Sequence, residues 1–474
     1  MLTHSAWGRY DSIAHGFYMN RRSLIVATAA ACFPAPAATT GAFRYRGYLG
    51  WITDLATFAD TYAEWPSMKL DEPLLKDYSE TFALMKQLGI EDLCIWGLYV
   101  SQAWPVDLAK SVPAERAKLV DRLIASAQSK GIRVVSGLGV YSWGFQEILK
   151  ANPHLMKGNA KTMCGSEEES WEWMRKVIDY VFTRFPIDGV SMQSADQGRC
   201  PCDKCKRFSE TEYHVQLNIR CAKYIHSRWP GKRVAVSGWG MRFDDPASLP
   251  HVVELSKHID YLIDVRDTSR RKDPAARPRL IGSLACAFGT LGGPQVEPPQ
   301  HWSRDRWFLP TVRAAGEHLG DLYRDGGRAC EWFYHIMANP GCEISTWVVG
   351  KTLADPATPW RKHLDTSVEQ IYRVTKPSLR DALCEAFLAA EEAYTRYLPS
   401  GFCGTISMEP LVSSQPGPPV YITKTLKPAQ RAEYSTTLVK VRAAFAKLER
   451  EIPDRRRLPL ILRCIDNVQK DLTA

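Results

Sequence analysis

Three carboxylic acids follow short apolar segments of the sequence, in positions where a carboxyl group could transfer a proton. Asp196 comes two residues after one such segment, Asp264 closes another, and Glu343 opens a helical pattern. A pair of carboxyl groups, one protonating the leaving oxygen and the other attacking or activating water, is the chemistry of glycosidic bond hydrolysis. We expect Asp196 to act as the acid, with Asp264 as the first candidate for its partner and Glu343 as the second.

The two aspartates also have structural interpretations. Asp196 could cap the next turn of the chain or pair with Arg199, and Asp264 could pair with Arg266 or Arg242. The choice between these roles depends on where the neighbouring arginines point, which the sequence leaves open.

Aromatic and polar side chains gather at the ends of the same apolar segments. Flat rings cover the C–H face of a pyranose while fixed polar groups bind its hydroxyls, so this mixture is what a sugar site needs. The alternative for each tryptophan is a place in the core. The predicted substrate-binding residues are Trp51, Asp54, Trp96, Tyr99, Trp143, Gln193, Arg199, Trp239, Arg266 and Asn339.

Three cysteines, Cys200, Cys202 and Cys205, stand in C-x-C-x-x-C spacing. Their thiols could surround one structural zinc ion, with Cys164 or Cys221 as the fourth ligand. The alternative is a disulfide in an oxidising compartment, which leaves one thiol over. Either arrangement would brace the loop that carries these cysteines, and we expect no cofactor for catalysis.

The elements that must position these residues alternate between strands and helices. Parallel strands with helical crossovers, repeated eight times, are best satisfied by a closed (β/α)8 TIM barrel, whose chemistry lies at the carboxyl ends of the strands. By this rule Asp188, which begins its strand, faces the structural end, and the mid-strand Glu331 has a structural role. The predicted strands are 43–52, 92–99, 132–140, 188–194, 233–239, 259–265, 280–288 and 329–335, and the predicted helices between them are 73–88, 113–130, 167–185, 207–228, 247–257 and 306–324.

The chain divides into three predicted regions. Residues 1–42 form an export signal and linker, 43–342 form the α/β barrel, and 343–474 form a helical C-terminal extension. The alternative fold is a doubly wound open sheet, but no Gly-rich phosphate loop follows the first strand. The predicted helices of the extension are 343–354, 361–374, 378–397, 427–451 and 455–472.

Residues 19–37 have the features of an export signal. Arg21 and Arg22 precede a short apolar run that ends at Ala35-Pro36-Ala37, a small-x-small cleavage pattern. The run is too short to span a bilayer, and the paired arginines resemble a twin-arginine signal for folded export. We expect an exported protein, periplasmic or extracellular, with Met19 as a candidate start; the alternative is a cytoplasmic protein with an apolar N-terminal run.

The composition is that of an ordinary globular protein. The 474 residues are 24% charged and 45% hydrophobic, which excludes collagen-like and largely disordered chains. No apolar run is long enough to predict an integral membrane segment. The 61 basic and 52 acidic residues give a net charge of +9 that favours an anionic ligand, but no basic block indicates nucleic acid.

The segment 188–205, which reads DGVSMQSADQGRCPCDKC, is the most distinctive local pattern. A strand that ends in an Asp and runs into G-R-C-x-C-x-x-C resembles secreted bacterial barrel proteins of the α-glucuronidase and β-hexosaminidase-like superfamily. The stretches Cys164-Gly-Ser166, Arg306-Trp-Phe-Leu-Pro310 and Asn339-Pro-Gly-Cys-Glu343 agree with this resemblance, which covers about residues 43–375. Where many relatives carry Glu on the fourth strand, this chain has Gln193.

The resemblance implies an exported glycoside hydrolase-like enzyme. Its expected partner is a carbohydrate, a polysaccharide or oligosaccharide, with acidic ones included. One alternative is a non-catalytic carbohydrate-binding barrel that keeps the tryptophans. Another is a uronate polysaccharide lyase, in which Tyr99, Tyr141 or His335 would be the base.

Overall fold

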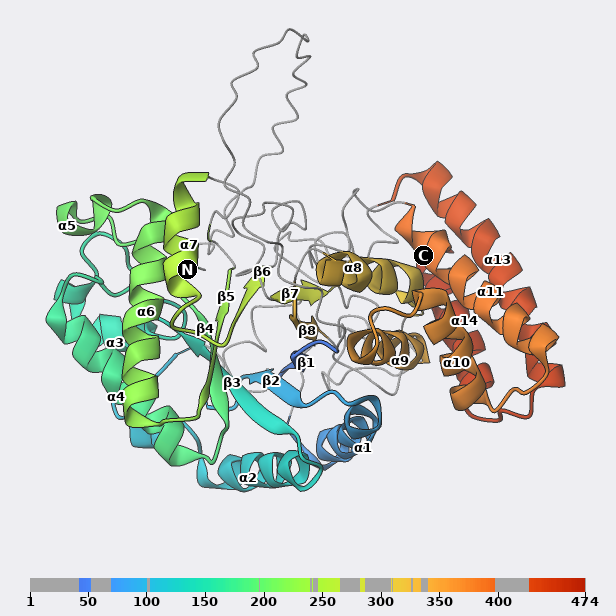
Figure 1. Cartoon of the computed structure of the whole chain (residues 1–474), viewed down its shortest axis with the longest axis horizontal. Helices are drawn as coiled ribbons and strands as arrows, with labels where there is room; N and C mark the ends of the chain where they lie inside the picture. The colour runs from blue at the N-terminus through green and yellow to red at the C-terminus, as the bar shows by residue number, and fades with distance from the viewer. Residues whose placement is uncertain are drawn as a thin grey trace, which may run out of the picture. The chain divides into compact units, whose positions relative to one another are not determined.

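The protein is described here by a computed structural model (Figure 1). Residues 41–474 form one compact unit, and the predicted export signal lies outside the described residues. The structure describes residues 42–52, 70–99, 103–195, 197–238, 241, 246–264, 282–285, 308, 310–324, 327–333, 340–396 and 426–473.

The described strands form a parallel barrel. Each strand pairs in parallel with the next one in the chain, and the last strand returns to pair with the first, so that the strand order is β1 to β8 around a closed barrel. The prediction of an α/β fold built on a parallel barrel is therefore confirmed. The strands are β1 (Tyr45–Trp51), β2 (Asp92–Trp96), β3 (Arg133–Gly139), β4 (Gly189–Gln193), β5 (Arg233–Ser237), β6 (Tyr261–Asp264), β7 (Gly282–Ala285) and β8 (Ala329–Phe333).

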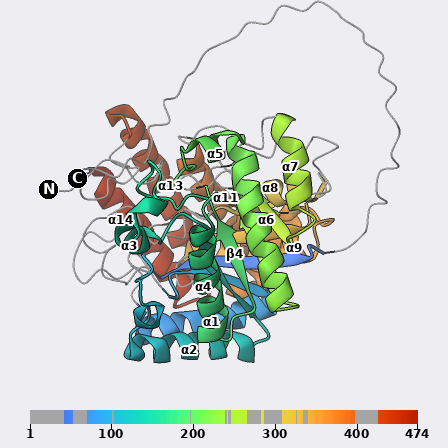
Figure 2. The same cartoon turned by 90° about the vertical axis from the view of Figure 1, so that its left-hand side faces the viewer.

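Helices follow most strands and lie around the outside of the barrel (Figure 2). None of the helices in the described part of the chain is long and apolar enough to cross a bilayer. The helices are α1 (Glu72–Leu88), α2 (Ala114–Ser129), α3 (Gln146–Ala151), α4 (Glu168–Arg184), α5 (Asp203–Lys206), α6 (Glu210–Arg228), α7 (Leu249–Leu255), α8 (Val312–Arg324), α9 (Pro340–Ala354), α10 (Trp360–Tyr372), α11 (Pro377–Thr395), α13 (Pro428–Glu451) and α14 (Arg457–Thr473).

Local capping residues decide where several helices begin and end. Helix α1 begins after Asp71, whose carboxylate accepts a hydrogen bond from the backbone of Leu74 (3.0 Å), and it ends at Gly89 in the left-handed region. The helix predicted at 207–228 begins at Glu210 instead, because Ser209 and Glu212 form a capping box.

Charged side chains that pair with one another occupy the amino end of the barrel interior. The Asp92 carboxylate, 1% exposed, pairs with the Arg133 guanidinium (2.8 Å) on the next strand and with Arg233, which lies across the barrel on β5. Nearer the middle, the buried Glu331 accepts a hydrogen bond of 2.6 Å from the Tyr261 hydroxyl. The Asp92–Arg233 and Tyr261–Glu331 contacts join strands that are not neighbours, so these side chains lie in the barrel interior and fill it.

The last helices are bound to the barrel's own helices. The Glu391 carboxylate of α11 accepts hydrogen bonds from the backbone N–H groups of Arg313 and Ala314 at the start of α8 (2.8 Å each). The Arg457 guanidinium of α14 contacts both carboxylate oxygens of Glu343 in α9 (2.7 Å each). The boundary predicted after residue 342 falls inside α9, because this helix begins at a proline, a residue favoured in the first turn.

Candidate functional site

The structure describes the side chains of only some predicted site residues. Those of Trp96, Tyr99, Trp143, Gln193, Arg199 and Glu343 are described. Trp51 and Asp264 end β1 and β6, but only their backbone placement is described. The remaining predicted residues, Asp54, Asp196, Trp239, Arg266 and Asn339, lie outside the described residues.

Two predicted tryptophans come together at the carboxyl end of the barrel. Trp96 ends β2 and Trp143 follows β3, and their rings meet edge to face with centroids 5.1 Å apart. The Trp96 ring covers Gly137, where a Cβ atom would lie 2.0 Å from the ring. Only glycine at this position leaves room for the indole, so the sequence of β3 is matched to an aromatic residue on β2.

The turn after β3 holds Trp143 in a strained backbone conformation. Tyr141 and Trp143 have φ angles of 60° and 41°, in the left-handed region that non-glycine residues seldom adopt. Each such residue costs about 1–3 kcal/mol, and such residues cluster at functional sites. The turn folds back so closely that a Cβ on Gly139 would lie 2.0 Å from the Trp143 carbonyl oxygen. The fold thus keeps a destabilising backbone conformation that places the Trp143 ring at this end of the barrel.

The end of β4 is anchored to both of its neighbours. The Gln193 carbonyl accepts a hydrogen bond from the Val140 backbone (2.8 Å), and the Ser194 carbonyl accepts one from the Ser142 hydroxyl (2.7 Å). On the other side, the Asn218 amide of α6 donates to the Ser194 hydroxyl (2.8 Å). The chain therefore leaves β4 in a fixed direction immediately before Asp196, with the Gln193 side chain half-buried.

Arg199 is bound within its own loop. Its guanidinium donates to the Phe208 carbonyl, and its own carbonyl oxygen lies 3.4 Å from the Asn159 amide, which donates more closely to the Gln197 carbonyl (3.2 Å). These contacts give Arg199 a role in shaping the loop between β4 and α6.

Tyr99 has a packing role in this structure. It is 2% exposed, and its hydroxyl donates to the Val181 carbonyl of α4 (2.6 Å). Its ring packs against Phe185 and Trp104, at centroid distances of 5.2 and 5.9 Å. Burial raises the pKa of the Tyr99 hydroxyl well above its ordinary value. These contacts direct the side chain toward α4, and we leave it out of the sugar site.

Glu343 joins two helices. Its carboxylate, 20% exposed, forms the two-pronged ion pair with Arg457 of α14, whose guanidinium also lies 3.4 Å from Asp454. This arrangement occupies both carboxylate oxygens, so we do not place Glu343 in the proposed acid–base pair. No sequence pattern links Glu343 to an arginine more than one hundred residues away.

Glu331 is a buried acid whose proton affinity the sequence does not reveal. It is 2% exposed, and burial raises its pKa to about 7, although the hydrogen bond from Tyr261 opposes this shift. A lone acid in an apolar strand is the only signal in the sequence. The structure places it in the middle of the barrel interior, consistent with the structural role predicted for it.

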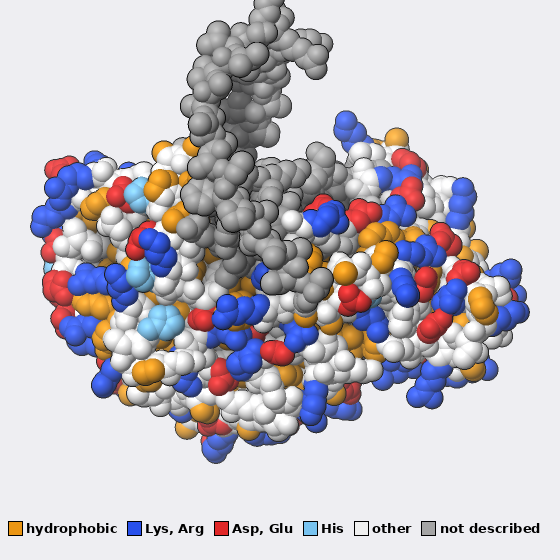
Figure 3. All heavy atoms as spheres, viewed as in Figure 1, with side chains coloured by type: hydrophobic (Ala, Val, Ile, Leu, Met, Phe, Trp, Pro, Cys, Tyr) orange, Lys and Arg blue, Asp and Glu red, His pale blue; other side chains and the backbone are white. Residues whose placement is uncertain are grey.

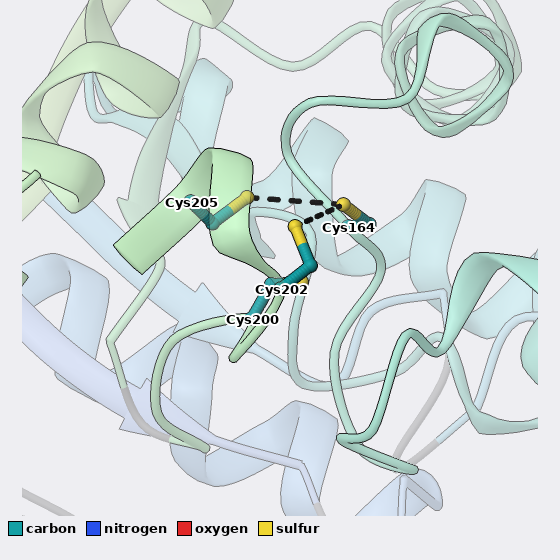
Figure 4. Close-up of side chains that lie close together, drawn as sticks. All are labelled: Cys164, Cys200, Cys202 and Cys205. Atoms are coloured by element: carbon teal, nitrogen blue, oxygen red, sulfur yellow. Dashed lines mark hydrogen bonds between the residues drawn. The ribbon is translucent and has the colours of Figure 1, made fainter. Parts of the chain in front are cut away.

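The predicted metal ligands lie together with a fourth cysteine. The sulfur atoms of Cys164, Cys200, Cys202 and Cys205 all lie within 4.8 Å of one another (Figure 4). Cys164 precedes α4, and the other three lie in or just before α5, so the group joins the loops after β3 and β4.

A concave region lies at the amino end of the barrel, opposite the end that carries Trp96 and Trp143. This open cleft of about 420 Å³ is close to the start of β6 and the end of α6. Barrel enzymes carry their chemistry at the carboxyl ends of the strands, so we do not place the active site in it. Its lining residues are Lys223, His226, Lys257, His258, Ile259 and Asp260.

Comparisons with known proteins identify the fold. A GH138 enzyme that targets pectin rhamnogalacturonan II has a TM-score of 0.53 and 12% identity, over 91% of this chain and 57% of its own. A mutant of the Thermobaculum terrenum O-GlcNAc hydrolase has a TM-score of 0.48 and 12% identity, over 91% of this chain and 83% of its own. The structure of CpGH84D has a TM-score of 0.49 and 7% identity, over 90% of this chain and 64% of its own.

At these identities the likeness shows the fold alone. The chain has a glycoside hydrolase-like fold, and it spans little more than half the length of the GH138 enzyme. No family model matches the sequence, and no curated protein matches it.

Proposed function

We propose that this protein is a glycoside hydrolase that cleaves a polysaccharide or oligosaccharide, with acidic glycans among its candidate substrates. The observation that carries the proposal is the aromatic carboxyl end of the barrel. There Trp96, Trp143 and the half-buried Gln193 lie on or just after three neighbouring strands. Trp96 is only 4% exposed and supports the half-buried Trp143 ring from behind. An aromatic ring and an amide that both keep part of their surface are suited to a pyranose ring and its hydroxyls. The glycoside hydrolase-like fold supports the same reading.

In this proposal Asp196 is the general acid and Asp264 is its partner. Asp196 comes three residues after Gln193, on the loop that the Ser194 hydrogen bonds anchor. Asp264 ends β6, so its backbone reaches the same end of the barrel. Protonation of the leaving oxygen by one carboxyl group, and attack or water activation by the other, would complete the hydrolysis.

The finer assignments belong to the same proposal. We assign the chain to the α-glucuronidase and β-hexosaminidase-like superfamily, as a (β/α)8 barrel with a helical C-terminal extension. The pattern around Arg21 and Arg22 supports export to the periplasm or the cell exterior. On the face shown in Figure 3, basic and acidic side chains are interspersed, so binding of an acidic glycan would depend on the site itself.

A carbohydrate-binding barrel without catalysis is the second candidate. Two observations favour it: the position at the end of β4 is an amide, Gln193, and the carboxylate of Glu343 is bound to Arg457. The lyase alternative has less support. Burial raises the pKa values of Tyr99 and Tyr141, which opposes ionisation of either as a base, and His335 lies outside the described residues.

One assay separates these functions. The full chain is incubated with neutral, uronic and sulfated glycans, and reducing ends and ultraviolet absorbance are followed together. New reducing ends without absorbance support hydrolysis, whereas an unsaturated, absorbing product indicates the lyase. Saturable binding of a glycan without any product, measured by calorimetry, would replace the hydrolase with the binding barrel.

A further inference from the structure

The four clustered cysteines are arranged as metal ligands are. The Cys164 sulfur lies 3.6 Å from that of Cys202 and 3.8 Å from that of Cys205 (Figure 4). Zinc–sulfur bonds of about 2.3 Å in a tetrahedron place any two sulfurs about 3.8 Å apart. These two separations match this value, and all four sulfurs lie within 4.8 Å of one another. The two separations are also far longer than the covalent distance of about 2.05 Å in a disulfide.

The backbone around the cysteines is already shaped for a bound ion. Cys202 immediately precedes the short helix α5, which contains Cys205, so that both sulfurs of the C-x-x-C pair face one point. The Ser166 hydroxyl lies 3.0 Å from the Cys164 sulfur and 3.7 Å from the Cys202 sulfur, within hydrogen-bonding reach of both. Such hydrogen bonds stabilise thiolate ligands and fix their direction.

Contacts outside the group hold its two loops in place. The Asn159 amide of the first loop donates to the Gln197 carbonyl of the second (3.2 Å). The Tyr213 hydroxyl of α6 accepts from the Gly165 backbone (3.1 Å), next to Cys164. The fold thus brings the four sulfurs together, so that an ion could bind them without rearrangement of the two loops.

From this geometry we propose that Cys164, Cys200, Cys202 and Cys205 bind one zinc ion in a tetrahedral site that joins the loop after β3 to the loop after β4. Cys164, Cys200 and Cys205 are fully buried and Cys202 is half-buried, and a set of four cysteine thiols with no open position is typical of a structural, four-coordinate zinc site. Cys221, the other sequence candidate for the fourth ligand, lies in α6 outside this group. The ion would fix the loop that carries Asp196, and the proposal does not depend on the activity.

Metal analysis of the purified full chain tests the site directly. We expect about one equivalent of zinc per chain, released when a mercurial reagent blocks the thiols. Cys164→Ser should lose the metal, whereas the matched Cys221→Ser should keep it. Loss of zinc in Cys221→Ser with retention in Cys164→Ser would overturn the proposed ligand set.

Spectroscopy of the wild-type chain keeps the test independent of variant folding. Cobalt exchanged for zinc should give thiolate-to-metal charge-transfer bands and the intense visible bands of tetrahedral coordination. Their absence, in a chain that also binds no zinc, would overturn the proposal. Thiol counts on such metal-free protein, denatured without reductant, would then show whether two of the four cysteines form a disulfide instead.

Discussion

The two ends of the barrel interior contain different kinds of side chain. At the amino end, Asp92 is fully buried between two arginines from different strands. At the carboxyl end, the interior is lined by the Trp96 and Trp143 rings, and the chain after β3 adopts strained backbone angles. At the first end the buried acid is neutralised by arginines of the barrel itself, whereas the second end carries the aromatic side chains that we propose for the ligand site.

This difference predicts that residues important for stability lie at the amino end of the barrel and residues important for function at the carboxyl end. Changes at the amino end should unfold the protein without altering its chemistry, and changes at the carboxyl end should do the reverse. The following substitutions test that separation, in order of decreasing expected effect.

The largest effect should come from Asp196→Asn. The amide keeps the size and hydrogen-bonding reach of the acid but removes its proton, so turnover should fall about 100- to 10,000-fold while glycan binding survives. Initial rates and calorimetric binding on the same substrate measure both. Asp264→Asn should be similarly damaging, whereas Glu210→Gln, an exposed acid on α6, should stay within a few-fold. An Asp196→Asn rate close to that of wild type would remove this residue from the mechanism.

Asp92→Ala should destabilise the fold by about 3 kcal/mol, because it leaves the half-buried Arg233 and Arg133 without their shared, buried carboxylate. Urea unfolding followed by circular dichroism gives the change. The matched control is Glu91→Ala, which removes an acid that is 42% exposed and pairs with Arg133 and Arg46; its loss should cost less than about 1 kcal/mol. Equal losses would mean that burial is not what makes the Asp92 contacts valuable.

Glu331→Gln should change how stability depends on pH. The pKa of Glu331 rises from its ordinary 4.5 to about 7 in the folded protein, mainly through burial. The folded state therefore binds the proton more tightly than the unfolded chain, and this contribution to stability, present below pH 4.5, is lost as the pH rises to 7.

The variant lacks this titration. Between pH 5 and 7 its free energy of unfolding should therefore fall by about 1–3 kcal/mol less than that of the wild type. Urea titrations at several pH values measure it. Glu391, whose pKa burial also raises to about 7, titrates in both proteins and cancels from the comparison. Parallel profiles of stability against pH for wild type and variant would contradict the raised pKa of Glu331.

The smallest effect is expected for Glu343→Gln. It replaces a partly exposed ion pair with a hydrogen bond from the charged Arg457 guanidinium to an uncharged amide, so stability should fall by about 1 kcal/mol with activity retained. Arg457→Gln should cost the same, and the double variant should cost no more than either. A Glu343→Gln protein of normal stability and no activity would return this acid to the catalytic pair.

The sequence predicted what depends on local pattern. The alternation of apolar strands and capped helices indicated a parallel barrel, and it placed Trp96 and Trp143 at strand ends on the same side of the barrel; that their rings contact each other came from the structure. Helix α3 was missed because six residues are too few for a helical periodicity to emerge.

Contacts between distant segments were beyond such reasoning. Nothing near Tyr99 shows that α4 will accept its hydroxyl, and nothing near Glu343 shows that Arg457 will reach it. The cysteines show both sides of this limit. Three of them formed a visible motif, but choosing Cys164 over Cys221 required the packing of two loops.

The carboxylate of Glu391 has a consequence for how the chain is completed during synthesis. It satisfies the first backbone N–H groups of α8, yet it lies 78 residues further along the chain than Arg313. When α8 leaves the ribosome, its amino terminus still lacks this partner, and the Arg457 that holds α9 is more distant still. The barrel's last two helices therefore gain their final contacts only after the C-terminal helices have been made, a late event in the life of each new chain.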